Sequence, residues 1–160
     1  FNSGDARITG AEINIRQNLR MLGKWGNTVT LFANATKLKL DGNPGANFTS
    51  FIPKSGNWGF TFAPKRFTFT ARWNYRGLDK RNPLAAYGPN GYDYIEARTV
   101  LDVNSSFQLT KKLSFVASAT NIFNKPYRFL RYGDDTPSYA KLYSEQEYGI
   151  QMAVGLRGTF

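Results

Sequence analysis

The stretch RFTFTARWNYR, residues 66–76, alternates strictly between apolar and polar side chains. A β-strand points successive side chains to opposite faces of its sheet, so a period of two predicts a strand with one apolar and one polar face. The apolar positions are Phe67, Phe69, Ala71, Trp73 and Tyr75, and the polar positions are Arg66, Thr68, Thr70, Arg72, Asn74 and Arg76. We therefore predict a strand that separates an apolar from a polar environment.

The same alternation recurs in six further segments of the 160-residue chain, at residues 11–19, 29–36, 57–62, 95–109, 113–120 and 148–160. Phe, Tyr, Thr, Asn and Gly are abundant, and this balance favours pleated sheet and turns over helix. Hairpin-sized connections join several consecutive segments, which makes those pairs antiparallel. We predict an all-β chain with seven antiparallel strands.

The connections between these segments alternate in length. LGKWGN, APKR and TKK are short, whereas the connections that begin at Leu40, Gly77 and Tyr132 are long. Short turns at one end of a sheet and long loops at the other are typical of outer-membrane barrels. The last segment is long enough to cross the hydrocarbon core when tilted, with Tyr148 and Phe160 expected at the two interfaces beside Trp73 and Tyr75. We therefore predict an antiparallel transmembrane β-barrel.

An open seven-stranded sheet in lipid would leave two edges with unpaired backbone groups, each costing several kcal/mol. We therefore expect residues 1–160 to be a fragment of a larger barrel.

The composition excludes several kinds of chemistry within these residues. The chain has no Cys and no His, which removes disulfides, thiolate nucleophiles, Ser-His triads and His-based metal sites. No Ser or Asp constellation is recognisable, so we expect no enzyme, no cofactor and no metal site. The formal charge of +10 is compatible with anionic partners, but we favour the interpretation that basic residues scattered over turns and a polar interior account for it. We expect no nucleic-acid partner.

Four motifs resemble TonB-dependent outer-membrane receptors. ATNIFNKPY, residues 119–127, resembles the Asn-Leu-Phe-Asp-Lys-x-Tyr element near their C-terminus, with Ile122 and Asn124 as departures. ITGAEINI, residues 8–15, is similar to their Gly-x-Glu strand. LFANATKL at 31–38 and IPKSGNWGFTF at 52–62 resemble two further strands, and AVGLRGTF at 153–160 resembles the terminal assembly signal, although Gly158 replaces an aromatic residue. Without the resemblance, the segment is a strand end, in which Asn121 and Asn124 form local side-chain-to-backbone hydrogen bonds and Pro126 ends the strand pairing.

The resemblance implies that residues 1–160 form the last seven strands of a 22-stranded barrel, preceded by a plug domain and earlier strands. It places the protein in the outer membrane of a Gram-negative bacterium with a periplasmic C-terminus. The implied function is energised uptake of a scarce ligand of siderophore, glycan, peptide or vitamin type. The implied partners are TonB-ExbB-ExbD through the plug, the lipid bilayer, and the barrel-assembly machinery through Gly155 and Phe160. Other outer-membrane proteins are further candidate partners.

Two sets of residues are candidates for contacts inside and above this barrel. Polar-face residues that we expect to face the lumen or plug are Glu12, Arg16, Arg72, Asn74, Arg76, Arg98, Asp102 and Arg157. Loop residues that combine rings with acceptors, and so suit a ligand, are Tyr87, Tyr92, Tyr94, Tyr132, Asp134, Asp135 and Tyr139. The alternative interpretation is that the first set only solvates the interior and the second only forms turns.

Three other functions remain open at this point. One is a non-transporting structural barrel or a porin-like channel in a larger assembly. Another is a soluble β-sandwich that binds anionic polymers through its basic residues. An outer-membrane hydrolase ranks lowest, because the chain lacks the residues for it.

Overall fold

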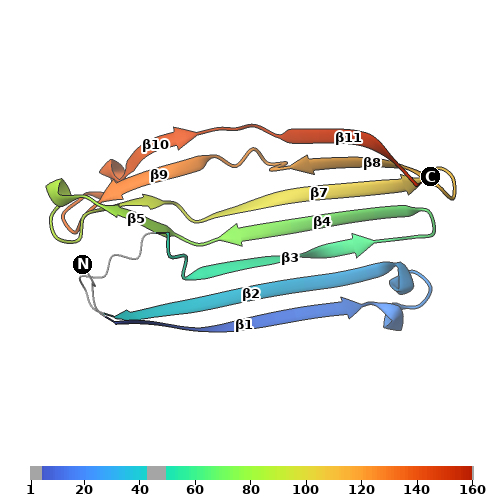
Figure 1. Ribbon diagram of the computed structural model, residues 1–160, viewed down its shortest axis with the longest axis horizontal. Helices are drawn as coiled ribbons and strands as arrows, with labels where there is room; N and C mark the ends of the chain where they lie inside the picture. Colours follow the sequence, from blue (N-terminus) through green and yellow to red (C-terminus); the bar gives the residue numbers. More distant parts are fainter. Residues whose placement is uncertain (1–4, 43–49, 160) are drawn as a thin grey trace.

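The computed structural model describes residues 5–42 and 50–159 and shows two antiparallel sheets that follow one another along the strand direction (Figure 1). No helix in these residues is long and apolar enough to cross a membrane. The short helical turns η1 (Arg20–Leu22), η2 (Gly26–Thr28), η3 (Ala85–Tyr87) and η4 (Ser138–Ala140) lie in connections. The prediction of an all-β antiparallel chain is confirmed.

The main sheet has seven strands in the order β1-β2-β3-β4-β7-β8-β11. Their bounds are β1 (Ala6–Asn18), β2 (Val29–Gly42), β3 (Lys54–Phe62), β4 (Phe67–Arg76), β7 (Arg98–Gln108), β8 (Leu113–Thr120) and β11 (Gln151–Gly158). Each neighbouring pair is antiparallel, with a continuous register. The seven predicted strands are therefore the seven strands of this sheet.

The connections of the main sheet are sorted by length, as predicted. Residues 19–28, 63–66 and 109–112 join neighbouring strands at one end, here called the turn end, which lies at the right of Figure 1. Residues 77–97 and 121–150 make the long connections at the opposite end, the loop end. The sheet therefore has short turns at one end and long connections at the other.

A second sheet extends the main sheet at the loop end, where the sequence predicts only loops. Its strands are β5 (Asp79–Pro83), β6 (Tyr92–Ile95), β9 (Tyr127–Tyr132) and β10 (Leu142–Gln146), in the order β10-β9-β6-β5. These strands are short, and Pro83 and a bulge near Leu142 interrupt two of them. They carry apolar and polar side chains on both faces, so the period-two signal is absent.

The last strand is shorter than the sequence predicts, because β11 begins at Gln151 and not at Tyr148. Gly149 has a φ of +74°, which L-residues rarely adopt, and it breaks the strand there. The Tyr148 ring instead packs edge-on against Tyr127, with centroids 5.8 Å apart. Tyr148 is therefore not the first residue of the apolar face, and Phe160 lies outside the described residues.

One face of the main sheet is apolar and exposed. The register places on this face nine large apolar residues that are between 42% and 75% exposed: Ile13, Ile15, Leu31, Trp58, Phe107, Phe115, Met152, Val154 and Leu156. Among the described residues, the buried apolar side chains are Ala71 and Leu101 alone. A water-soluble sandwich would cover such a face with a second layer, whereas a barrel wall presents it to lipid.

We predict that arginine on the two faces of β11 has opposite consequences. Val154 lies at the middle of β11 on the apolar face, and an arginine on the lipid face near the midplane costs about 2–4 kcal/mol. Val154→Arg should lower the free energy of unfolding of the full-length protein in lipid vesicles by about that amount. Ala153→Arg, one residue away on the polar face, is the matched control and should cost much less. Equal losses for both variants would contradict the assignment of faces.

Candidate ligand-contact site

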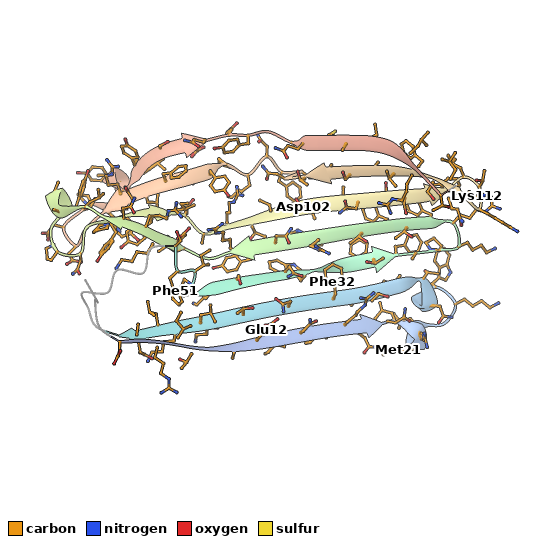
Figure 2. The ribbon with its side chains drawn as sticks, in the orientation of Figure 1. Glu12, Met21, Phe32, Phe51, Asp102 and Lys112 are labelled. Carbon is orange, nitrogen blue, oxygen red and sulfur yellow. The ribbon has the colours of Figure 1, made fainter. Side chains whose placement is uncertain are left out.

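The polar face of the main sheet carries a row of amides and carboxylates across its strands. Asn34, Asn57 and Asn74 are direct cross-strand neighbours on β2, β3 and β4. Asn34 donates to Glu12 Oε1 at 2.7 Å, and Asn74 donates to Asp102 Oδ2 at 2.7 Å. Figure 2 labels Glu12 and Asp102, which lie toward the two sides of this row. The row connects β1–β2 and β4–β7 on a single face.

All eight residues predicted to face the lumen or plug occupy positions on this polar face: Glu12, Arg16, Arg72, Asn74, Arg76, Arg98, Asp102 and Arg157. Arg72 is opposite Asp102, but its guanidinium lies 5.6 Å from the ring centroid of Phe32. Arg76 is opposite Arg98 at the loop end of the sheet. The structure brings these residues onto one surface, and their contact with a plug stays a prediction.

A fully buried carboxylate connects the two sheets. Asp79 has an exposed fraction of 0% and accepts from Arg76 Nη2 at 2.9 Å and from Arg81 Nη1 at 3.4 Å. Arg81 also donates to Ser50 Oγ at 2.7 Å. Asp79 therefore fixes the start of β5 to the end of β4. The sequence analysis missed this residue, although an Asp with Arg three residues before it and two after it is a recognisable signal.

The turn after β8 has the chemistry expected from its asparagines. Asn121 and Asn124 adopt the left-handed conformation, with φ of 55° and 46°. The Asn121 side chain donates to the Lys125 carbonyl and accepts from the Lys125 amide, which confirms its predicted local bonding. The Asn124 side chain instead reaches Glu147 Oε2 at 3.2 Å. The backbone N–H of Asn121 donates to Asp102 Oδ1 at 3.0 Å, and this bond attaches the turn to the polar row.

Beyond this turn the polar face continues into the second sheet. The Arg98 guanidinium lies 3.4 Å from the ring centroid of Tyr127. Both line a hollow of about 260 Å³ together with Asp102, Tyr148 and Gln151. Because Asp102 belongs to the polar row, Tyr127 lies on the same face as that row.

A second hollow of about 260 Å³ lies on the same face of β9, because Phe129 and Arg131 are two and four residues after Tyr127. Arg131 Nε donates to Asp93 Oδ1 at 2.9 Å, a bond that raises the pKa of Arg131, and its guanidinium lies 3.8 Å from the ring centroid of Tyr143. Seven residues that line the two hollows are here called the arginine–aromatic cluster: Arg81, Asp93, Arg98, Tyr127, Phe129, Arg131 and Tyr143. This cluster offers aromatic surfaces beside charged donors and one acceptor.

Three of the predicted ligand residues lie on the opposite face of the second sheet. Tyr92 is opposite Tyr132 in the register, and Tyr94 stacks on Tyr132 with centroids 4.2 Å apart. Burial, followed by the neighbouring Tyr132, raises the pKa of Tyr94 to about 12. Lys80 Nζ lies 3.4 Å from the Tyr92 centroid. These tyrosines therefore form a stack on the face opposite Arg131, and Tyr94 also lines the hollow beside Arg131.

The other four predicted ligand residues lie in the connections at the tip of the second sheet. The Tyr87 segment packs against Gly133, and Asn90 donates to Asp134 Oδ2 at 2.7 Å. Asp135 is exposed, and Tyr139 is 88% exposed. The tyrosine stack thus gathers three of the seven predicted residues, and Asp134 lies near enough to contribute to the raised pKa of Tyr94. No group of three or more acidic side chains in the described residues could hold a metal ion.

The sequence analysis missed the arginine–aromatic cluster apart from Arg98. The segment YRFLRY, residues 127–132, places Tyr127, Phe129 and Arg131 on one face and Arg128, Leu130 and Tyr132 on the other. Each face mixes aromatic, aliphatic and basic side chains, so no apolar period distinguishes them. An alternation of aromatic residues with arginine was the only available signal.

Comparison with known proteins supports the fold. The chain is similar to the crystal structure of the ferric citrate transporter FecA in the unliganded form, with a TM-score of 0.71 and 19% sequence identity over 96% of this chain. It spans about a quarter of that protein's length, 24%. No model of a protein family matches the chain, and no curated protein matches it. The likeness supports the fold alone, an antiparallel sheet consistent with a fragment of a β-barrel wall.

We predict that the Asp79 carboxylate contributes more to stability than the Asp93 carboxylate. Asp79→Ala leaves the partly exposed Arg76 and Arg81 without their buried partner and should lower the free energy of unfolding by about 1–3 kcal/mol. Asp93→Ala is the matched control, because the pair that Asp93 forms with Arg131 is about 30% exposed and should contribute less than about 1 kcal/mol. Urea unfolding of the full-length protein in vesicles measures both. A larger loss for Asp93→Ala would contradict the assignment of Asp79 as the junction.

Proposed function

We propose that this chain is part of the barrel wall of a TonB-dependent transporter that takes up a scarce ligand across the outer membrane. The observation that carries the proposal is the division of one sheet between an exposed apolar face and a polar face that continues into a second sheet beyond the loop end. The motif resemblance and the likeness in fold to a ferric citrate transporter support it.

In this proposal the apolar face contacts lipid and the polar face contacts a plug or the lumen. The C-terminal strand ends on the periplasmic side, and Gly155 and Phe160 contribute to recognition by the barrel-assembly machinery. TonB-ExbB-ExbD would act through a plug domain, and the chain itself would perform no catalysis. The protein would reside in the outer membrane of a Gram-negative bacterium, as the wall of a barrel of the 22-stranded class.

A porin-like channel or a structural barrel is the alternative. A hollow of about 400 Å³ on the polar face favours the channel, because small side chains such as Thr70, Ser106, Ser118 and Ala153 line it. Such a surface is suited to a column of water. The same space would accommodate a plug, so the two functions differ in what occupies the barrel.

We further propose that the arginine–aromatic cluster contacts the ligand. Six of its members lie on the second sheet, on the face that continues the polar face, and Arg98 lies at the adjoining end of β7. In this proposal they lie above the point where a ligand would enter the barrel. The guanidinium of Arg98 has no acidic partner in the part of the chain that the structure describes. Stacked aromatic and guanidinium groups suit the planar or anionic groups of a chelate, glycan or peptide.

The transporter and channel proposals predict different electrical behaviour. Purified full-length protein in a planar lipid bilayer should show no steady conductance in KCl, because a plug blocks the barrel. The same preparation should bind the purified periplasmic domain of TonB. A steady conductance without TonB binding would contradict the transporter proposal and support the porin-like channel.

The arginine–aromatic cluster can be tested with two arginines of β9. Arg131 belongs to the cluster and pairs with Asp93, whereas Arg128 lies on the opposite face and pairs with Glu145 at 2.6 Å. Binding of metal chelates, oligosaccharides and peptides to the full-length protein is measured by calorimetry. For whichever compound binds, Arg131→Ala should weaken the affinity at least tenfold, which is about 1.4 kcal/mol. Arg128→Ala should leave it within twofold, and the reverse order would contradict the proposal.

A further inference from the structure

The apolar face of β1–β3 contains a groove. In one cross-strand row, Ala35 and Gly56 lie between the larger Ile13 and Tyr75. These residues line a hollow of about 450 Å³, and Trp58 lines both this hollow and a second one of about 410 Å³. Small side chains between large ones therefore leave an apolar depression that follows the strands toward the turn end.

The second hollow extends the depression along β2. The next row places Ala33 between Ile15 and Trp58, and beyond it Leu31 and Phe60 restore large side chains. From residue 37 to residue 33 of β2 the depression runs about 13 Å, at about 3.3 Å per residue. Its shape is therefore long and narrow, and it fits an extended hydrocarbon chain.

Two lysines lie at the loop end of this groove. Lys37 and Lys54 are direct cross-strand partners, and both line the first hollow. Both are exposed, and neither forms an ion pair within residues 5–42 and 50–159. Like charges directly opposite each other in a sheet are destabilising. An anion bound between the two ammonium groups would remove that repulsion.

The lysine pair coincides with a change in polarity along β2. On the turn-end side the apolar face carries Leu31, Ala33 and Ala35, whereas on the loop-end side it carries Lys39, which pairs with Asp41 at 2.7 Å. A boundary between apolar and charged side chains is where lipid head groups meet a membrane protein. Lysine stems can lie along the apolar surface there while the ammonium groups reach the head groups.

We propose that the groove and the Lys37–Lys54 pair bind one phosphorylated glycolipid of the lipid A type. An acyl chain would occupy the depression over Ala35, Gly56 and Ala33, and a phosphate would bridge the two ammonium groups. The membrane location rests on the proposed function, and so does the choice of the outer leaflet, because that orientation places the loop end outside the cell. A phosphate with close to two negative charges complements two adjacent lysines better than a carboxylate does.

The test uses the full-length protein in detergent, native mass spectrometry and added lipid A. The charge variant is Lys37→Gln with Lys54→Gln, and the groove variant is Ala35→Leu, which fills the depression with another apolar side chain. The control is Lys111→Gln with Lys112→Gln, which removes two exposed lysines from the turn end. Heat-dependent gel mobility checks that every variant is a folded barrel.

We expect one bound lipid A on the unmodified protein, at least tenfold weaker binding for both the charge and the groove variants, and unchanged binding for the control. Equal binding by all four proteins would overturn the proposal. Phosphatidylglycerol that binds as tightly as lipid A, with the same sensitivity to the variants, would overturn the glycolipid assignment. A dimer that Ala35→Leu abolishes, without bound lipid, would show that a second copy occupies the groove instead.

Failure of the proposed function is distinguishable from failure of this inference. TonB binding and conductance are measured on the same preparations, and none of these variants should alter them. Lipid A binding without TonB binding would contradict the transporter proposal and support the lipid site. TonB binding without lipid A binding would contradict the lipid site alone.

Discussion

Antiparallel register is the constraint on which the rest of this structure depends. Side chains alternate between faces with a period of two, so a slip of one residue in any pair would transfer an entire apolar set to the polar face. The pairing of Trp58 with Trp73 and of Trp73 with Leu101 keeps β3, β4 and β7 aligned on the apolar side. On the other side, the bond from Asn74 to Asp102 fixes the same register by polar contact. Contacts on both faces of the sheet therefore stabilise the same register.

The stability of such a sheet does not come from a conventional core. Nine large apolar side chains remain exposed on its apolar face, and Ala71 and Leu101 are the only buried apolar residues in the described chain. In water this surface would drive aggregation, whereas in lipid it needs no cover because the solvent is apolar. What lipid does demand is complete backbone pairing, since an unpaired group there costs several kcal/mol. The free edges of β1 and β11 therefore argue for further strands in the assembled barrel.

The sequence predicts the main sheet well because each of its strands has one apolar and one polar face. Residues 66–76 show the alternation clearly, and the observed strand β4 runs from Phe67 to Arg76. The second sheet was not predictable in this way, because both of its faces carry mixed apolar and polar side chains. Tyr148 illustrates the same limit: its parity fits an apolar face, but the left-handed Gly149 interrupts the strand. An alternating sequence pattern therefore reveals strands whose two faces differ in polarity, and it misses strands whose two faces are alike.

The junction between the sheets explains why three of the predicted ligand residues, Tyr92, Tyr94 and Tyr132, lie on a different face from the Tyr127 side of β9. If alternation continued unbroken from Arg98 back through β6, Tyr94 would lie on the polar face. The strand assignment is interrupted at Glu96 and Ala97, and Arg98 contacts Tyr127 while Tyr94 stacks on Tyr132, on the other face of β9. Matching interruptions at 77–78, 121–126 and 147–150 separate the whole second sheet from the alternation of the main sheet. The alternation in the main sheet therefore does not determine which side chains of the second sheet continue its polar face.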